Sequence, residues 1–125
     1  MSANLLPHAY ADFLTGAHQD THQYALALYD KNPKVGEVYD GKADHTVDLS
    51  GYKVTTKDAK ATLNFSDVHL DGVTLRYRYV VLFNKDCGNR TITLIDQGKH
   101  VGVELGNISI YMPKDGLVEF GAVNG

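Results

Sequence analysis

The sequence lacks the residues and runs that several protein classes require. Its 125 residues include one cysteine, Cys87, and no tryptophan. A single cysteine cannot form an internal disulfide or supply the cysteine pairs of a zinc site. No stretch approaches the ~20 apolar residues of a membrane-spanning helix, and the N-terminus has neither the basic start nor the apolar run of a signal peptide. We therefore expect a cytosolic protein that is neither secreted nor bound to a membrane.

An excess of basic residues is also missing. Lysine and arginine number 12 against 15 aspartates and glutamates, which gives a formal net charge of -3. Such a chain lacks the positive surface that nucleic-acid-binding proteins use, so we expect no nucleic-acid partner. A content of 43% hydrophobic and 22% charged residues is typical of a globular protein. The length predicts a single domain over residues 1–125.

Motifs that carry chemistry are absent as well. The chain has no G-x-S-x-G nucleophile elbow, no glycine-rich phosphate loop and no H-E-x-x-H. Of its six histidines, only His18 and His22 have the i, i+4 spacing of metal ligands, and we interpret them as a structural or solvent-facing pair rather than a metal site. Cys87 lies beside Asp86, whose charge disfavours a thiolate. The sequence thus predicts no enzyme, no catalytic residue, no cofactor and no metal site.

What the sequence does contain is the periodicity of one helix followed by strands. Apolar residues recur at helical spacing near the N-terminus: Leu6, Tyr10, Phe13 and Leu14. Pro7 suits a first helical turn and Gly16 suits the position just beyond the end. These signals predict a short amphipathic helix over residues 7–15.

Alternating β-branched and aromatic residues then predict strands, with turn signals between them. The strand segments are 23–31, 51–57, 60–70, 73–83, 91–98 and 106–112, followed by a turn and a last strand within 113–123. The intervening turns are predicted at 70–72, 85–89 and 99–107, and the polar stretch 37–50 is predicted as a long loop with at most a short edge strand. The fold class is therefore all-β, a single antiparallel β-sandwich or jelly-roll-like domain over 22–123 with one short N-terminal helix.

The strand "LRYRYVVLF" over 75–83 changes character along its length. Strict alternation places Leu75, Tyr77 and Tyr79 on one side and Arg76 and Arg78 on the other. From residue 80 onward both faces are apolar, which is typical of a central strand whose second face is covered, either by the N-terminal helix or by another subunit.

Two interpretations of Arg76 and Arg78 stay open. Each arginine could form a solvated ion pair with a nearby carboxylate such as Asp67 or Glu104, and such pairs contribute little to stability. Alternatively, both could dock on a partner that carries carboxylates, because the planar guanidinium is enriched at interfaces.

Residues 1–6 form a second candidate for partner binding. Leu5 and Leu6 have no obvious place in a sandwich core, and chain ends are usually mobile unless they are tied down. We predict a flexible arm that orders against a neighbouring subunit. The candidate partner-binding residues are Leu5, Leu6, Arg76 and Arg78.

Five phrases occur in an order that resembles a family of small tailed-bacteriophage virion proteins. They lie within 27–30 (Ala-Leu-Tyr-Asp), 67–68 (Asp-Val), 83–86 (Phe-Asn-Lys-Asp), 95–98 (Ile-Asp-Gln-Gly) and 111–117 (Tyr-Met-Pro-Lys-Asp-Gly-Leu). The resemblance covers about Phe13 to Phe120. It departs from the family pattern where Tyr111 and Met112 replace a tryptophan, and in a loop over 31–50 that is shorter than usual.

This resemblance implies a non-enzymatic virion structural protein, made in the host bacterial cytoplasm and located on the capsid surface of the virion. The role it implies is that of a decoration, or cement, protein that binds the major capsid protein as a homo-oligomer, with a trimer favoured. Two other classes stay open. One is a tail or fibre component that binds a carbohydrate or receptor, supported by the eight tyrosines. The other is an enzyme or metalloprotein, which no motif supports.

Overall fold

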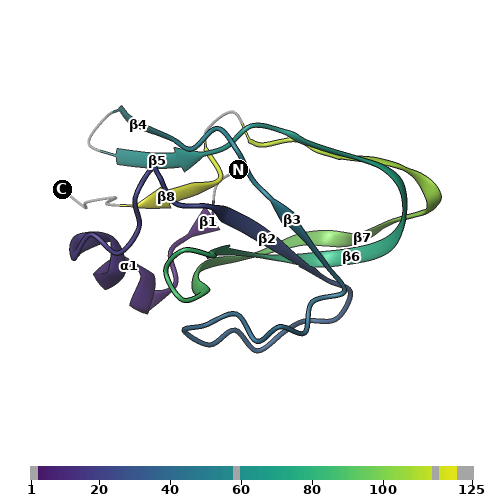
Figure 1. Ribbon diagram of the computed structural model, residues 1–125, viewed down its shortest axis with the longest axis horizontal. Helices are drawn as coiled ribbons and strands as arrows, with labels where there is room; N and C mark the ends of the chain where they lie inside the picture. The colour runs from purple at the N-terminus through teal and green to yellow at the C-terminus, as the bar shows by residue number, and fades with distance from the viewer. Residues whose placement is uncertain (1–2, 58–59, 114–115, 121–125) are drawn as a thin grey trace.

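The chain folds into two four-stranded sheets and one short helix (Figure 1). The structure, a computed structural model, describes residues 3–57, 60–113 and 116–120. Its elements are β1 (Ala3–Asn4), α1 (Pro7–Leu14), β2 (Tyr24–Tyr29), β3 (His45–Asp48), β4 (Lys53–Lys57), β5 (Lys60–Asn64), β6 (Val68–Asn84), β7 (Arg90–Ile110) and β8 (Val118–Phe120). The strand orders are β1-β8-β5-β4 and β3-β2-β6-β7. The predicted all-β class with one short helix is confirmed, whereas the sandwich or jelly-roll arrangement stays a prediction.

The N-terminal half matches the predicted elements closely. The helix runs from Pro7 to Leu14, β2 lies within the predicted strand 23–31, and β3 is a short edge strand within the predicted loop 37–50. No helix in the described part of the chain is long and apolar enough to cross a membrane.

Strands β6 and β7 form one long hairpin that organises the rest of the molecule. They pair from Asn84↔Arg90, beside the predicted turn at 85–89, to Val68↔Ile110. Figure 1 shows this pair bending back on itself at the right of the view, so that its two ends lie in different layers. The hairpin therefore links the two sheets along one continuous ribbon.

Two predicted turns prove to be bulges inside this hairpin. Residues 70–72 and 99–107 lie within β6 and β7, and the register shifts between Leu70 and Val73 and between Val73 and Leu75. Bulges accommodate extra residues without ending a ladder, which explains why turn-forming residues occur inside a strand. Gly72 has a φ of 64°, a left-handed conformation that glycine adopts without strain.

The predicted strand over 60–70 is instead two strands in different sheets. β5 ends at Asn64 and β6 begins at Val68. Between them, the Ser66 N–H donates to the Ser50 carbonyl at 2.8 Å. Both strands alternate with a period of two residues. The sequence pattern therefore gives no sign that the chain passes from one sheet to the other between them.

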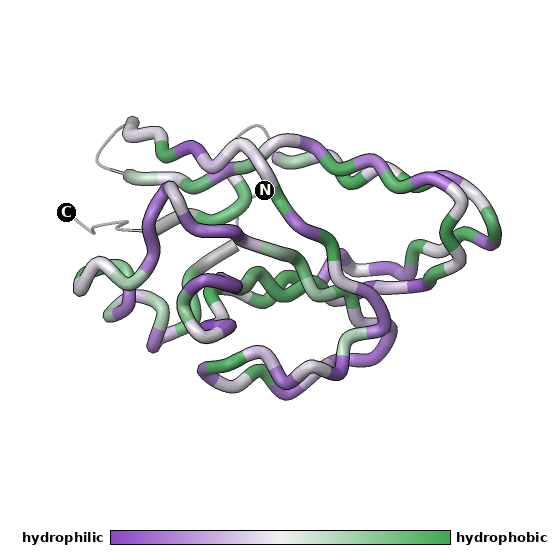
Figure 2. Tube along the Cα trace, viewed as in Figure 1, coloured by the Kyte–Doolittle hydropathy of each residue, from purple (hydrophilic) through white to green (hydrophobic). Residues whose placement is uncertain are grey.

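The main core lies between the sheets and takes side chains from both. Its most buried members are Ala9, Tyr24, Leu26, Leu28, Leu63, Leu82, Ile92 and Val118. Helix α1 contributes the fully buried Ala9, and Phe13 packs partly against the same core. Figure 2 shows hydrophobic residues concentrated where β6 runs beside β2.

A second, smaller core occupies the other face of β2 and β6. It contains Ala25, Ala27, Tyr29, Val81 and Phe83. The loop over 30–44 covers it through residues that include Tyr39, whose ring stacks on Phe83 with centroids 4.5 Å apart. The sequence suggested that the helix or another subunit covers this face. In the structure, a loop of the same chain covers it instead.

Candidate functional site

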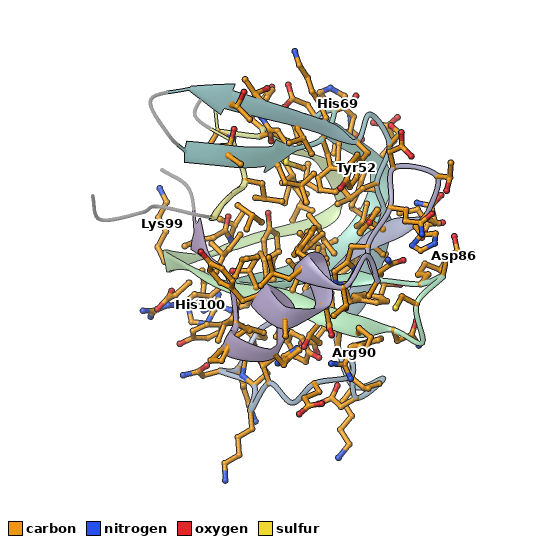
Figure 3. All side chains as sticks on the ribbon, turned by 90° about the vertical axis from the view of Figure 1, so that its left-hand side faces the viewer. Tyr52, His69, Asp86, Arg90, Lys99 and His100 are labelled. Atoms are coloured by element: carbon orange, nitrogen blue, oxygen red, sulfur yellow. The ribbon has the colours of Figure 1, made fainter. Side chains whose placement is uncertain are left out.

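Five charged or titratable side chains gather where the β6–β7 hairpin bends, and we call them the bend cluster: Asp30, Arg76, Arg78, Asp96 and His100. Asp30 follows β2, the arginines lie on β6, and Asp96 and His100 lie on β7. Figure 3 shows His100 beside Lys99 at one edge of the molecule, far from Asp86 at the opposite edge. Three chain segments that are distant in sequence therefore meet in this cluster.

Arg76 is the most exposed arginine of the bend cluster. Its Nε donates to Asp30 Oδ1 at 3.2 Å, and 64% of its side chain is exposed. The same carboxylate oxygen lies 3.1 Å from His100 Nε2, which is also 3.0 Å from the Asp30 carbonyl oxygen. Arg76 thus forms a single solvated ion pair that a competing carboxylate could replace.

Arg78 is held more firmly than Arg76. Its Nε and Nη2 donate to the two Asp96 oxygens at 2.8 and 3.1 Å, and its guanidinium carbon lies 5.3 Å from the centroid of the Tyr79 ring. The hydrogen bonds from Arg78, followed by one from the Gly98 N–H, lower the pKa of Asp96 below its ordinary value. This pair therefore stays ionised across the neutral range.

The pairing of β6 with β7 is irregular beside Arg78, between the two arginines. Leu75 and Tyr77 belong to the main core, whereas Tyr79 belongs to the second core. The register shifts between Tyr77 and Tyr79, where residues 97–100 of β7 lie opposite Arg78, and the side chains of β6 exchange faces there. The prediction that Tyr79 shares a side with Leu75 and Tyr77 is wrong because alternation does not continue through a bulge.

The carboxylates named from the sequence are not the partners of the arginines. Asp67 accepts a hydrogen bond from the Met112 N–H at 2.6 Å instead, and Glu104 is exposed on β7. Asp30 and Asp96 take their places. The interpretation of Arg76 and Arg78 as surface ion pairs fits this geometry, and docking on a partner stays a prediction.

The arm predicted over residues 1–6 is partly integrated into the fold. β1 pairs in parallel with β8, and the Leu6 N–H donates to the Ile92 carbonyl at 2.9 Å. Leu5 and Leu6 are half-buried against the main core. Residues 1 and 2 lie outside the described residues. The expectation that Leu5 and Leu6 lack a place in the core is therefore wrong, because the bent hairpin leaves room for them beside β7.

Replacing both Leu5 and Leu6 with serine should lower the free energy of unfolding by about 2 kcal/mol, since two half-buried apolar contacts are lost. Chemical denaturation measures the change. Leu14→Ser is the matched control because 80% of Leu14 is exposed. If the double variant is as stable as the control, both leucines are free of the core and the flexible-arm prediction regains its basis.

His18 and His22 both contact the side-chain amide of Asn84, and we call these three residues the histidine junction. Asn84 Nδ2 lies 3.0 Å from His18 Nδ1 and 2.9 Å from His22 Nδ1. Asn84 is fully buried at the end of β6. The i, i+4 spacing signalled that the two histidines act together, but no signal in the sequence identified Asn84 as their partner. Within the described residues, no group of three or more His, Cys, Asp or Glu side chains could hold a metal ion.

His18 is the strongly perturbed titratable group of this junction. Burial lowers the pKa of His18 to about 4, against a smaller opposing effect of Asp12, and no hydrogen-bond partner is recorded for its Nε2 in the described part of the chain. The ring of Phe13 packs against it with centroids 4.6 Å apart. His18 is therefore neutral at pH 7 and resists protonation.

Arg90 joins three elements near the histidine junction, a role that sequence patterns did not indicate. It donates to both Asp12 oxygens at 2.8 and 3.0 Å and to Glu37 at 3.2 Å. Asp12 belongs to α1 and Glu37 to the 30–44 loop. Arg90 thus connects the helix and the loop to the start of β7.

Two large hydrophobic side chains are exposed, one on β7 and one directly after its end. Leu105 is 82% exposed and Tyr111 is 72% exposed. The Tyr111 ring meets His69 edge-on at 6.1 Å.

Comparison of the chain with protein-family models, with curated proteins and with solved structures gave no match.

Proposed function

We propose that this chain is a non-enzymatic bacteriophage virion structural protein, and specifically a decoration protein that binds the major capsid protein on the outer capsid surface and stabilises the head. The phrases that resemble the virion family support this role. The structural observation that carries the proposal is the bend cluster, which presents Arg76 with 64% of its side chain exposed.

An exposed ion pair can change partners at little cost. The Arg76–Asp30 pair lies at the surface, where such pairs contribute about 0–1 kcal/mol. A carboxylate of the capsid protein that excludes water from Arg76 would form a stronger pair, because truncating a desolvated partner costs about 2 kcal/mol or more. Arg78, two residues along the same strand, is engaged by Asp96 in a bidentate pair.

Stabilisation of the head follows from repeated weak contacts. A decoration protein binds across the seams between capsid subunits, and each bound copy favours the assembled particle by mass action. An oligomer that matches the local three-fold symmetry of the capsid would add its contacts through multivalency. The proposed partner is therefore the major capsid protein, and the proposed assembly is a homotrimer.

Replacing Arg76 and Arg78 together with alanine should reduce affinity for undecorated capsids about 30-fold, which corresponds to roughly 2 kcal/mol. The melting temperature should change little because both pairs lie at the surface, where ion pairs contribute little to stability. Binding of the wild type should also weaken as salt rises. Sedimentation of capsids with bound protein across a salt series measures both effects.

Lys85→Ala is the matched control for this experiment. Lys85 forms a comparable surface pair with Asp48 at 2.9 Å, outside the bend cluster. If the double variant binds capsids as tightly as Lys85→Ala and the wild type do, the arginines are only a solvated surface and the bend cluster is not the capsid-binding site.

A second candidate function is a tail or fibre component that binds a carbohydrate or receptor. Tyr111 favours it, since an aromatic ring that is 72% exposed can stack on a sugar. Binding to a glycan array that is lost in Tyr111→Ala would support this function over capsid decoration.

A further inference from the structure

The orientation of the Asn84 amide in the histidine junction is fixed by the backbone. The Asp86 N–H donates to Asn84 Oδ1 at 3.0 Å, which places the oxygen on that side. The amide nitrogen therefore faces both rings, at 3.0 Å from His18 Nδ1 and 2.9 Å from His22 Nδ1. Both Nδ1 atoms must therefore accept hydrogen bonds, which places the ring proton of the buried His18 on Nε2.

The histidine junction lies at the centre of the contact between the N-terminal segment and the β6–β7 hairpin. The loop 15–23 joins α1 to β2, and Gln23 is tied to the hairpin turn by its N–H, which donates to Asp86 Oδ2 at 2.7 Å. On α1, His8 Nε2 lies 2.9 Å from the Thr91 carbonyl oxygen. With the Asp12–Arg90 pair, these polar contacts hold residues 7–23 against the end of the hairpin.

A proton on His18 would enter an unfavourable environment. The groups that face His18 are His8 and Asp12 of α1, His22 of the loop, Tyr24 of β2, Asn84 of β6 and Arg90 of β7. Asp12 Oδ2 is 3.9 Å from His18 Nε2, but both Asp12 oxygens already accept from Arg90. The only carboxylate among these groups is therefore engaged by another cation.

We propose that the histidine junction is an acid-sensitive latch that releases the segment 7–23 from the β6–β7 hairpin while the two sheets stay folded. A proton added to His18 goes to Nδ1, which then becomes a donor that faces the donor amide of Asn84. The amide cannot rotate to accept it without opposing the Asp86 N–H. The contact must therefore open. This inference does not depend on a role in the virion.

The direction of the pH effect follows from the difference between the closed and open states. In the open state His18 regains an ordinary pKa of about 6.5, whereas burial lowers it to about 4 in the closed state. Between these values the open state binds a proton that the closed state does not. The opening equilibrium should therefore rise about 30-fold from pH 7.5 to pH 5.

Hydrogen exchange of the full chain at pH 7.5 and pH 5, corrected for the intrinsic rates, tests the latch. We expect amides in residues 7–23 to exchange about 30-fold faster at pH 5 after this correction, and to be less protected at both pH values than amides of β2 and β6, which exchange only through global unfolding. Equal protection of residues 7–23, β2 and β6 at pH 5 would show that all of them exchange through global unfolding and would overturn the latch. No acceleration in residues 7–23 would overturn it as well.

Two variants separate the latch from a general acid effect. Asn84→Asp replaces the donor with an acceptor, so a protonated His18 is then favoured and the acceleration at pH 5 should disappear. His18→Gln removes the buried titrating group and should remove most of the acceleration even if Asn84→Asp folds poorly. His69→Gln is the matched control, because His69 is exposed, and it should respond as the wild type does. Full acid response in His18→Gln would overturn the proposal.

Discussion

Lowering the pH from 7 to 4 should remove about 3 kcal/mol of the free energy of unfolding through His18 alone. The His18 side chain is fully buried, and burial lowers its pKa from 6.5 to about 4. Above pH 6.5 the folded and unfolded chains are both neutral at this residue, so it has no effect on the pH dependence. Between pH 6.5 and 4 the unfolded chain binds a proton that the folded chain excludes, so the free energy of unfolding decreases as the pH is lowered.

The measurement is urea denaturation of the wild type and of His18→Gln at intervals from pH 7 to pH 4. Carboxylates contribute to both curves, so the difference between the two proteins isolates His18. That difference should shift by about 3 kcal/mol in favour of the variant as the pH falls. Parallel curves would contradict the buried, neutral state of His18.

Replacing Leu82 with alanine should lower the free energy of unfolding by about 3 kcal/mol, because the change leaves a cavity at the centre of the main core. Leu82 is completely buried on β6, where it pairs with Leu26 of β2 and Thr93 of β7. Neighbours on both sides are fixed in a ladder, so they have little freedom to collapse into the space. Thermal and urea denaturation measure the loss.

Leu105→Ala makes the same chemical change on the same hairpin at a side chain that is 82% exposed. It should alter stability by less than about 0.5 kcal/mol. Equal losses in the two variants would contradict the placement of Leu82 in the core and of Leu105 at the surface.

Local patterns in the sequence were sufficient for elements whose geometry is set by neighbouring residues. The spacing from Leu6 to Leu14 and Pro7 predicted α1, and the turn at 85–89 was predicted from its own residues. The alternation in β2 also identified a strand, although all six of its side chains are buried. Each of these signals acts over a few positions and does not depend on which distant segments of the chain pair with one another.

Features that depend on the path of the chain could not be predicted in this way. The pairing of Arg76 with Asp30 requires β6 to lie beside β2, and the exchange of faces at Arg78 requires a bulge that alternating sequence conceals. The partner of the two histidines, Asn84, follows a buried apolar run and could have been read as the first residue of a turn. Periodicity gives the faces of a strand only as long as its register is unbroken.

The parallel pairing of β1 with β8 has a consequence for the order of folding. Ala3↔Val118 joins the two ends of the chain, whereas the β6–β7 hairpin closes through the short turn at 85–89. Closing a longer loop costs more conformational entropy, so the hairpin is favoured as an early structure and the terminal pair as a late one. A contact that is absent from the transition state affects the rate of unfolding and leaves the rate of folding almost unchanged. The two residues of β1 therefore act on how long the native state persists rather than on how quickly it is reached.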